Sequence, residues 1–414
     1  MVSLTPKGMR DFLPQEMINR EMVIEKITAV YRLYGFRPIE TPALEYASTL
    51  KAKSGDEIAG QIFKIEGDEI GLRFDLTVPL ARVAANNAIP KPFKRYCISK
   101  VWRKEEPQKG RMREFSQADA DIIGCRGMRA EAELVLLANE ALLALGFPKP
   151  IFLLNNRKFL NAVAEKAGII GEKAIVFRIL DKVDKTGMDK AKADIGALIG
   201  TEQTEKLFEM LPSGLDNVGN LEQIKKISPE AGEELEQIIK NTSEADVKID
   251  LFLIRGLGYY TGPIFEIKLG EGIGSVGGGG RYDGLLEIYG QADCATGISL
   301  GIERLMYLIA ERNKSNSGEG AQTYTKIFVS STKECFSEAV RTAGEFRKAG
   351  ISAETDLNER NLKKQFDYAN SLGIRYVAVI GEREVNEGKI TLRDMVSGKE
   401  EMIAVSEAIA RVKG

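Results

Sequence analysis

Two stretches of alternating residues between Lys94 and Gly124 predict a pair of strands. The charged segment between them contains Pro107 and Gly110, which favour a turn. Successive side chains of a strand point to opposite faces, so the second stretch should have one polar face and one face of small apolar residues that could lie against a helix. The predicted polar face carries Phe115, Gln117, Asp119, Asp121 and Ile123.

This predicted hairpin has two interpretations. Its aromatic ring, amide and carboxylates, with Arg103 on the partner strand, would suit a nucleotide bound beside a cationic or polar small molecule. The alternative is a solvated antiparallel hairpin with one face in water. The rest of the chain favours the first interpretation.

Two short strands are predicted at residues 62–65 and 71–74, where apolar residues alternate with polar ones. Asp75 follows, with a hydroxyl two residues further on, and the two groups could bind an ammonium group. An aspartate followed by Thr77 and Pro79 is also typical of a helix cap. Both interpretations stay open for Asp75.

Two other regions differ from the strand pattern. Residues 36–42 read as an extended segment broken by prolines, which fits a sheet edge or a subunit contact better than a central strand. Residues from about 155 to 245 are rich in Lys and Glu around a few apolar positions and predict a helical insertion between two pieces of one sheet.

The strand signal returns at residues 249–255 and 263–269 and is followed by four glycines, Gly277–Gly280. Glycines weaken a strand, so such a run marks either a close approach of a ligand or second backbone, or a flexible loop. No Gly-Lys-Ser/Thr follows the run, which excludes a phosphate-binding P-loop.

Arg304 lies near the start of a predicted helix, after the stretch 295–301. A cation in the first turn opposes the helix dipole and costs about a few tenths of a kcal/mol unless an anion binds there. We therefore expect Arg304 to meet an anion. A Ser, Asn and Gly-rich linker at 313–321 precedes alternating strands and helices, which predict a small α/β domain of its own.

The composition limits the classes of function. The chain has 414 residues, which predicts two or three domains, and its 58 basic and 60 acidic residues leave no overall charge that attracts nucleic acid. A polyanion must therefore meet local basic patches such as residues 100–113. Four cysteines without paired spacing and no bilayer-length apolar run predict a cytoplasmic protein with no membrane contact.

The chain contains no histidine. This excludes Ser-His-Asp triads, His metal sites and imidazole acid/base catalysis. Any chemistry must depend on carboxylates, arginines, a metal bound by oxygen atoms, or groups of the substrate itself.

Taken together, the motifs resemble those of class II aminoacyl-tRNA synthetases and, in detail, the histidyl-tRNA synthetase family. Arg103–Glu105 with Arg111–Gly124 is similar to the second class-defining motif, Gly297–Arg304 to the third, and Pro38–Pro42 to the first, which lies at the family's dimer interface. The stretches 255–262 and 278–284 resemble the two motifs peculiar to the histidine enzymes, and 381–388 resembles the anticodon-binding domain.

The resemblance implies an α/β (α+β) fold: an antiparallel-sheet catalytic domain over 1–320 with the helical insertion, and an α/β anticodon-binding domain over 321–414. It also implies a homodimeric histidine–tRNA ligase. The enzyme would use ATP with Mg²⁺ to activate L-histidine and transfer it to the 3′ end of tRNA(His), without a metal bound by Cys or His.

The family's functional residues fall on positions in this sequence. ATP would contact Arg103, Glu105, Arg111, Phe115, Arg255 and Arg304, with Arg103, Arg255 and Arg304 as the catalytic arginines. L-Histidine would contact Asp75, Leu76, Thr77, Gln117, Asp121, Tyr259, Tyr260 and Tyr282. The sequence departs from the family pattern at Gly258, where an aspartate is common, and at Ser116, where a larger residue is usual.

Two other functions are alternatives. One is a non-catalytic, histidine-sensing subunit like that of ATP phosphoribosyltransferase, but such relatives typically lose the phosphate arginines and the tail domain, and this chain keeps both. The other is a plain RNA-binding module, against which the near-neutral charge and the lack of a recognised RNA-binding signature count.

Overall fold

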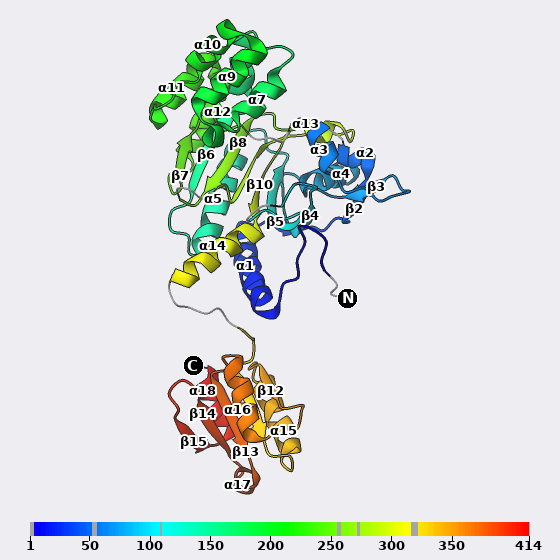
Figure 1. Ribbon diagram of the computed structural model, residues 1–414, viewed down its shortest axis with the longest axis vertical. Helices are drawn as coiled ribbons and strands as arrows, with labels where there is room; N and C mark the ends of the chain where they lie inside the picture. Colours follow the sequence, from blue (N-terminus) through cyan, green and yellow to red (C-terminus); the bar gives the residue numbers. More distant parts are fainter. Residues whose placement is uncertain are drawn as a thin grey trace. The chain divides into compact units, whose positions relative to one another are not determined.

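The computed structural model of the chain describes residues 4–51, 56–107, 110–254, 258–270, 274–315 and 322–413. The chain forms two compact units (Figure 1). The larger consists of residues 1–11 and 23–311, and the smaller of residues 12–22 and 312–414.

An eight-stranded sheet organises the larger unit, in the order β1-β4-β5-β10-β9-β8-β6-β7. All neighbouring strands are antiparallel except the pairs β1–β4 and β6–β7. The predicted antiparallel sheet is therefore confirmed. The strands span β1 Arg37–Pro38, β4 Phe93–Trp102, β5 Glu114–Ile123, β6 Ile151–Asn156, β7 Asp246–Ile249, β8 Pro263–Lys268, β9 Gly277–Arg281 and β10 Ala295–Gly301.

The proline-broken segment lies at the edge of this sheet, as predicted, because β1 is the first strand in the order. A separate two-stranded sheet consists of β2 Leu44–Tyr46 and β3 Ile70–Leu72. The helices outside the helical segment between β6 and β7 are α1 Pro14–Leu33, α2 Ala47–Lys51, α3 Asp56–Gln61, α4 Thr77–Asn86, α5 Arg129–Ala144, α13 Gly284–Glu287 and α14 Ile302–Ser315.

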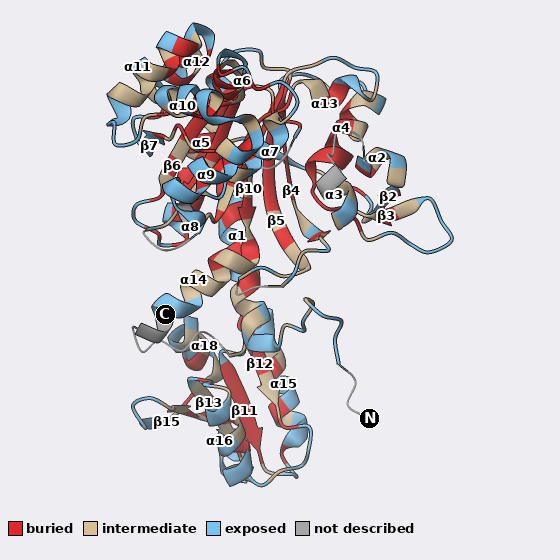
Figure 2. Cartoon of the chain, turned by 45° about the horizontal axis from the view of Figure 1, so that its top comes forward, coloured by how far each residue is buried: buried red, intermediate tan, exposed pale blue. Residues whose placement is uncertain are grey.

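One face of the large sheet packs against α1 and α5. The small residues Ala118 and Ala120 of β5 are fully buried in the same hydrophobic core as Leu134 of α5 and Tyr31 of α1, and the Tyr31 hydroxyl donates to Ala118 O at 3.1 Å. The expected packing of this face against a helix is confirmed. Figure 2 shows that β5 and β10 are largely buried along their length, whereas buried and partly buried residues mix along β4.

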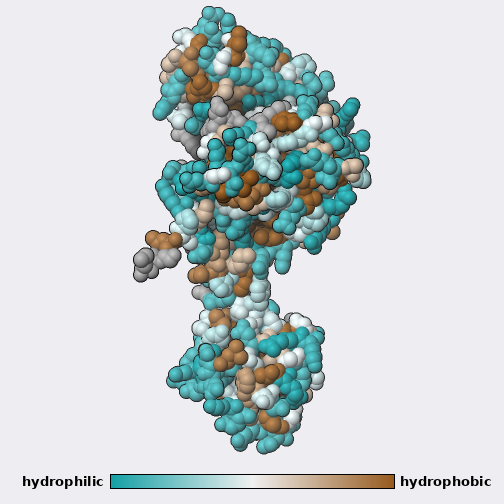
Figure 3. Space-filling view, turned by 90° about the vertical axis from the view of Figure 1, so that its right-hand side faces the viewer, coloured by the Kyte–Doolittle hydropathy of each residue, from teal (hydrophilic) through white to brown (hydrophobic). Residues whose placement is uncertain are grey.

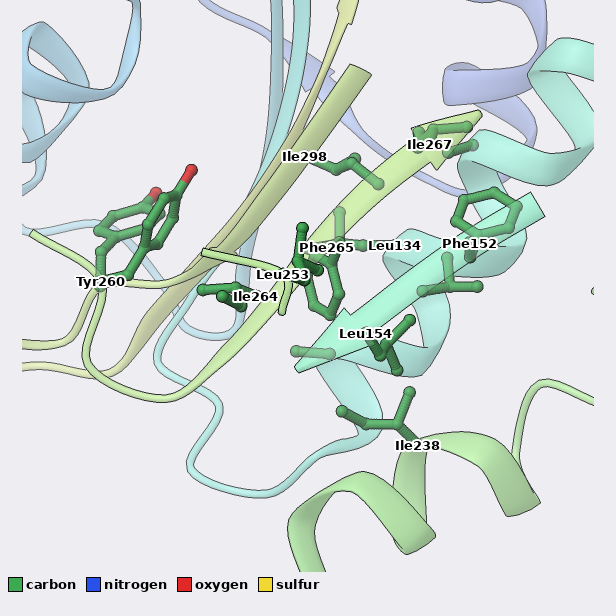
Figure 4. Close-up of a cluster of buried hydrophobic side chains, with 14 of the residues drawn as sticks. Leu134, Phe152, Leu154, Ile238, Leu253, Tyr260, Ile264, Phe265, Ile267 and Ile298 are labelled. Carbon is green, nitrogen blue, oxygen red and sulfur yellow. The ribbon is translucent and has the colours of Figure 1, made fainter. Parts of the chain in front are cut away.

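Helices fill the chain between β6 and β7, which are neighbours in the sheet. Figure 4 shows Ile238 of α12 beside Leu154 of β6, with Phe265 and Ile267 of β8 in the same apolar cluster. These helices are α6 Arg157–Lys166, α7 Lys173–Leu180, α8 Val183–Thr186, α9 Met188–Ile199, α10 Thr201–Met210, α11 Asn217–Ile227 and α12 Pro229–Lys240.

The smaller unit has its own five-stranded sheet, in the order β12-β11-β13-β14-β15, and its own hydrophobic core. The interior strand β11 is buried at every position. The elements are β11 Ile327–Ser331, α15 Phe336–Lys348, β12 Ala353–Thr355, α16 Leu362–Ser371, β13 Tyr376–Ile380, α17 Glu382–Glu387, β14 Ile390–Asp394, β15 Glu400–Ile403 and α18 Val405–Lys413. This is the small α/β domain that the sequence predicts.

Two strand predictions are wrong, and the structure decides between the two interpretations of the glycine run. Residues 62–65 do not form a strand, because only an isolated bridge joins Lys64 to Gly71. The strand predicted at 249–255 instead ends at Ile249, since the Asp250 side chain accepts from Phe252 N at 2.9 Å and starts a turn. The four glycines form the interior strand β9, so the flexible-loop interpretation is wrong.

Figure 3 shows a surface that is mostly hydrophilic, with smaller hydrophobic patches. Among the helices of the described residues, none is both long and apolar enough to cross a membrane.

Candidate active site

The strand register brings the polar face of β5 between two other strands. Asp121 lies opposite Arg95 of β4 on one side and Gly297 of β10 on the other. Gln117 lies opposite Ser99 and Gly301 in the same way. Since facing residues of paired strands share a face, these side chains occupy the sheet face away from α1 and α5.

Asp121 is the centre of a buried polar cluster. Its Oδ2 lies 2.7 Å from Arg95 Nη2, and its Oδ1 accepts a hydrogen bond from the Tyr282 hydroxyl at 2.5 Å. The carboxylate lies over bare backbone, because a Cβ on Gly297 would come within 2.0 Å of Asp121 Oδ1. The glycine at 297 therefore makes room for the carboxylate.

Asp119 is a second buried carboxylate on the same face. Burial raises its pKa to about 7, the charge of Arg95 opposes this rise, and the charge of Asp121 adds to it. Within the described residues, Asp119 Oδ1 and Gln117 Oε1 are buried acceptors with no hydrogen-bond donor. Buried acceptors are normally satisfied, so these two atoms suit a ligand that carries N–H donors.

Asp75 contacts the start of α4, and the ammonium group expected to bind it stays a prediction. Its Oδ1 accepts from Val78 N at 3.0 Å in the first turn of α4, while the Tyr259 hydroxyl lies 3.4 Å from its Oδ2. Burial raises the pKa of Asp75, and the Val78 N–H and the charge of Arg103 oppose that rise. The carboxylate is thus a helix cap that also faces the site.

Three tyrosine rings border this acidic region. The Tyr259 ring centroid lies 5.0 Å from that of Tyr260 and 6.0 Å from that of Tyr282, both in edge-on arrangements. Leu76 contributes its backbone, because its carbonyl oxygen accepts from Arg95 Nη2 at 3.1 Å. Thr77, also predicted here, is the buried first residue of α4.

Phe115 and Arg103 lie toward the other end of the hairpin. The guanidinium of Arg103 lies 5.1 Å from the centroid of the Phe115 ring, and its Nε donates to Phe74 O at 3.0 Å. Glu105 Oε1 is 4.0 Å from Arg103 Nη1. Phe115 keeps partial exposure while packing on the cluster of Leu76, Cys97 and Val101.

Arg304 lies in the first turn of α14, beside a strand of the site. The neighbouring Glu303 accepts from Ser116 N at 2.7 Å, which fastens the start of α14 to β5. Burial lowers the pKa of Arg304, as does the nearby charge of Arg111, whereas Glu266 raises it. Among the described residues no carboxylate lies within ion-pair distance of Arg304 or Arg111, an arrangement that favours an anion.

The structure therefore brings together most of the predicted residues. Arg255 lies outside the described residues, so its predicted meeting with Arg103 and Arg304 has no structural description. Sequence reasoning missed Arg95 entirely and assigned no role to Asp119. Arg95 shares a strand face with Cys97 and Ser99, and this spacing was the available signal. Only the strand register, however, shows that this face of β4 lies beside Asp121.

No group of three or more His, Cys, Asp or Glu residues that could hold a metal ion is found in the described part of the chain. The charged groups that the site offers to phosphates are guanidinium groups.

A family model for histidyl-tRNA synthetase matches residues 8–305, and one for an anticodon-binding domain matches residues 325–414. A histidine–tRNA ligase of Phocaeicola vulgatus is 38% identical, covering 99% of this chain and 98% of that protein. One of Korarchaeum cryptofilum is 40% identical, covering 95% and 94% respectively.

The fold has solved counterparts as well. The crystal structure of a histidyl-tRNA synthetase from Nostoc sp. matches with a TM-score of 0.84 and 29% identity, covering 100% of this chain and 99% of that one. The antiparallel sheet with its polar face and the separate α/β domain define a class II aminoacyl-tRNA synthetase. Within that class, the chain belongs to the histidyl-tRNA synthetase family.

Proposed function

We propose that this protein activates L-histidine with ATP and transfers it to the 3′ end of tRNA(His). The observation that carries the proposal is the arrangement of charge on one sheet face: buried carboxylates with tyrosines lie at one end, and arginines with the Phe115 ring lie at the other. An amino acid and a nucleoside triphosphate need these two environments side by side. The identity over nearly the full length of histidine–tRNA ligases supports the choice of substrate.

Histidine binds at the acidic end. Its α-ammonium group is held by Asp75, Thr77 and Gln117, whose buried amide oxygen has no donor among the described residues. Its imidazole ring meets Asp121, with Tyr282 beside that carboxylate and Tyr259 and Tyr260 around the ring. A wrong side chain would leave a buried acceptor unpaired, which is the strongest form of discrimination that binding can supply.

ATP binds at the basic end. The adenine ring stacks on Phe115, with Glu105 on the adenine side, and the α-phosphate meets Arg103. Arg304 and Arg111 meet the outer phosphates, which explains two cations lying together. From the family resemblance, Arg255 stands beside the α-phosphate opposite Arg103. Mg²⁺ bound with the nucleotide would supply further positive charge to the phosphates, beside the arginines.

The reaction needs no imidazole from the protein. The carboxylate oxygen of histidine forms a bond to the α-phosphorus, the bond to the bridging oxygen breaks, and diphosphate leaves. The site aligns two anions and stabilises the charge that develops on the transferred phosphoryl group, which arginines do by position and field. The histidine adenylate then reacts with a hydroxyl at the 3′ end of tRNA, and a phosphate oxygen of the adenylate takes the proton as AMP leaves.

The C-terminal α/β domain binds the anticodon region of the tRNA. We divide the chain into a catalytic domain, 1–320 with its insertion at about 155–245, and an anticodon-binding domain, 321–414. The extents of the two family models, 8–305 and 325–414, support this division. The same role fits a cytoplasmic enzyme, where tRNA charging supplies translation.

The working form is a homodimer that pairs along the β1 edge. Edge strands present unpaired backbone groups that favour association. Two hollows of about 520 and 530 Å³ lie along this edge, and residues 38–43 contribute to their lining. Light scattering on the eluting protein tests this: a mass of one chain, near 45.6 kDa, would refute the dimer.

One assay tests the proposed function. Labelled diphosphate should exchange into ATP only when L-histidine is present, and tRNA(His) should then become charged. A histidine-sensing regulator would bind histidine without exchange, and a plain RNA-binding module would show neither activity. No observation here favours either alternative, and the retention of Arg103, Arg111 and Arg304 counts against the regulator.

A further inference from the structure

Strand β9 has few side chains that could hold it in place. Four of its five residues are glycines, Gly277–Gly280, so it has almost no side chains with which to pack. It is nevertheless an interior strand between β8 and β10, next to Gly297, over which Asp121 lies. The strand ends at Arg281, and Tyr282, whose hydroxyl meets Asp121, follows directly. A strand of bare backbone needs an anchor at its end if it is to hold Tyr282 in place.

Arg281 provides such an anchor on the opposite face of the sheet. Its Nε and Nη2 donate to the two carboxylate oxygens of Glu131 in α5, at 2.8 and 2.9 Å. Both side chains are almost entirely buried, with 4% of Arg281 and none of Glu131 exposed. Further guanidinium hydrogens are donated to Cys125 O, Gly127 O and Asp283 Oδ1.

The backbone of Arg281 connects this anchor to the tyrosines of the site. Its carbonyl oxygen accepts from Thr261 N at 2.8 Å, directly after the Tyr259–Tyr260 pair. Tyr282 N donates to Ala295 O at 2.7 Å. The side-chain stem fits over Gly262, where an added Cβ would lie 3.1 Å from Arg281 Cδ. One residue thus fixes the ends of two segments that carry the tyrosine rings.

We propose that the Arg281–Glu131 ion pair is a positioning device that sets the affinity for histidine by holding Tyr282 and the bare strand β9 in register with Asp121. The inference rests on the proposed function, because it treats Tyr282 and Asp121 as part of the histidine site. Neither Arg281 nor Glu131 touches substrate. Their effect passes through the sheet to the face above.

The energetics of buried pairs give the proposal its test. Removing one partner leaves the other as an uncompensated buried charge, whereas removing both together costs less than the two single losses combined. If the pair acts as one unit, R281Q, E131Q and the double variant R281Q/E131Q should disturb the histidine site to a similar extent.

The experiment measures the KM for histidine, the KM for ATP and kcat in histidine-dependent diphosphate exchange. Each single variant should raise the KM for histidine about tenfold, equivalent to about 1.4 kcal/mol. The KM for ATP and kcat should stay within about twofold, the usual limit for independent sites. The double variant should match the singles. Arg281→Lys, which keeps the charge beside Glu131, should recover part of the affinity.

A control is Lys158→Gln, which removes two other ion pairs of the same unit, to Glu230 and Glu234 in α12, and lies away from the site. It should change neither KM. Equal rises in both KM values, additive losses in the double variant, or a fall in kcat with both KM values unchanged, as expected from a smaller folded fraction, would overturn the proposal. Absence of histidine-dependent exchange in the unaltered protein would instead refute the proposed function, whatever the variants do.

Discussion

Along β5 the catalytic face changes character from one end to the other. At the acidic end, Asp121 is 2% exposed and its charge is met by Arg95, which is fully buried. At the basic end, Arg304 is half-buried beside Arg111 and has no carboxylate partner among the described residues. At the acidic end the charge of Asp121 is balanced by a buried partner, whereas the basic end keeps its charge available.

The difference matches what each end has to recognise. A buried, compensated carboxylate is held in one position, so it can discriminate by hydrogen-bond geometry. Cations that repel each other gain most when a polyanion binds between them, so they recognise phosphates by charge. Asp119 is intermediate: it shares the charge of Arg95 with Asp121, and its pKa is raised to about 7.

The largest effect is expected from Asp121→Ala. This variant removes the carboxylate that is ion-paired with Arg95 and leaves Asp119 as its remaining buried counter-charge, so the free energy of unfolding should fall by up to about 3–5 kcal/mol. Histidine-dependent exchange should be lost while ATP binding survives. Urea unfolding measures the loss of stability, and ATP titration measures the retained ATP binding. The near-isosteric Asp121→Asn is a milder variant for the same measurements. Unchanged exchange would remove Asp121 from the pocket.

Arg304→Ala sharpens the comparison from the other end. It should lose about 2–4 kcal/mol of transition-state stabilisation, seen as a fall in kcat/KM for exchange. The free energy of unfolding should not fall correspondingly, because the substitution relieves repulsion with Arg111. Lys206→Ala, which removes an exposed cation of α10, is the control and should leave exchange unchanged. Parallel losses of stability and activity would mean that Arg304 is a structural residue.

Gly297→Ala tests whether the Asp121 carboxylate needs a residue without a side chain beneath it. The new Cβ would lie 2.0 Å from Asp121 Oδ1, so the carboxylate must move. Overpacking of this kind costs about 1–3 kcal/mol, and the affinity for histidine should fall more than that for ATP. Gly344→Ala in α15, where a Cβ meets nothing within 4 Å, is the control and should be neutral or stabilising. Equal behaviour of the two variants would contradict the role of this glycine.

The last prediction concerns the pH dependence of stability. The folded protein retains a proton on Asp119 up to about pH 7, whereas the unfolded chain releases it near the ordinary pKa of 3.8. The contribution of Asp119 to stability is therefore present at low pH and is lost as the pH rises through this window. Asp119→Asn should flatten that part of the profile. Unfolding measured at about pH 5 and about pH 8 checks the sign, and an unaltered slope would argue against the raised pKa.

Much of the face was predictable from the sequence because strand alternation is local. Phe115, Gln117, Asp119 and Asp121 share a face in the sequence pattern and in the structure. The unusual place of Arg304 in a first helical turn marked it as a functional residue, and the anion expected there stays a prediction. Such signals depend on neighbours along the chain, so the sequence carries them directly.

The rest depended on tertiary pairing. Arg95 and Lys94 look alike in the sequence, and only the register, Arg95 opposite Asp121, decides which of them is buried. The contact of Glu303 with Ser116 N joins residues far apart in the chain. The four glycines admitted a loop or a strand until their neighbours β8 and β10 were known.

The division of the face into a histidine end and an ATP end is tested most directly by titration calorimetry of both ligands on two variants, Asp121→Asn and Arg304→Gln. Asp121→Asn should lose affinity for histidine and keep its affinity for ATP, while Arg304→Gln should do the reverse. If both variants lose both ligands to the same extent, or if either keeps the ligand assigned to its own end at full affinity, the two ends do not have the separate roles proposed here.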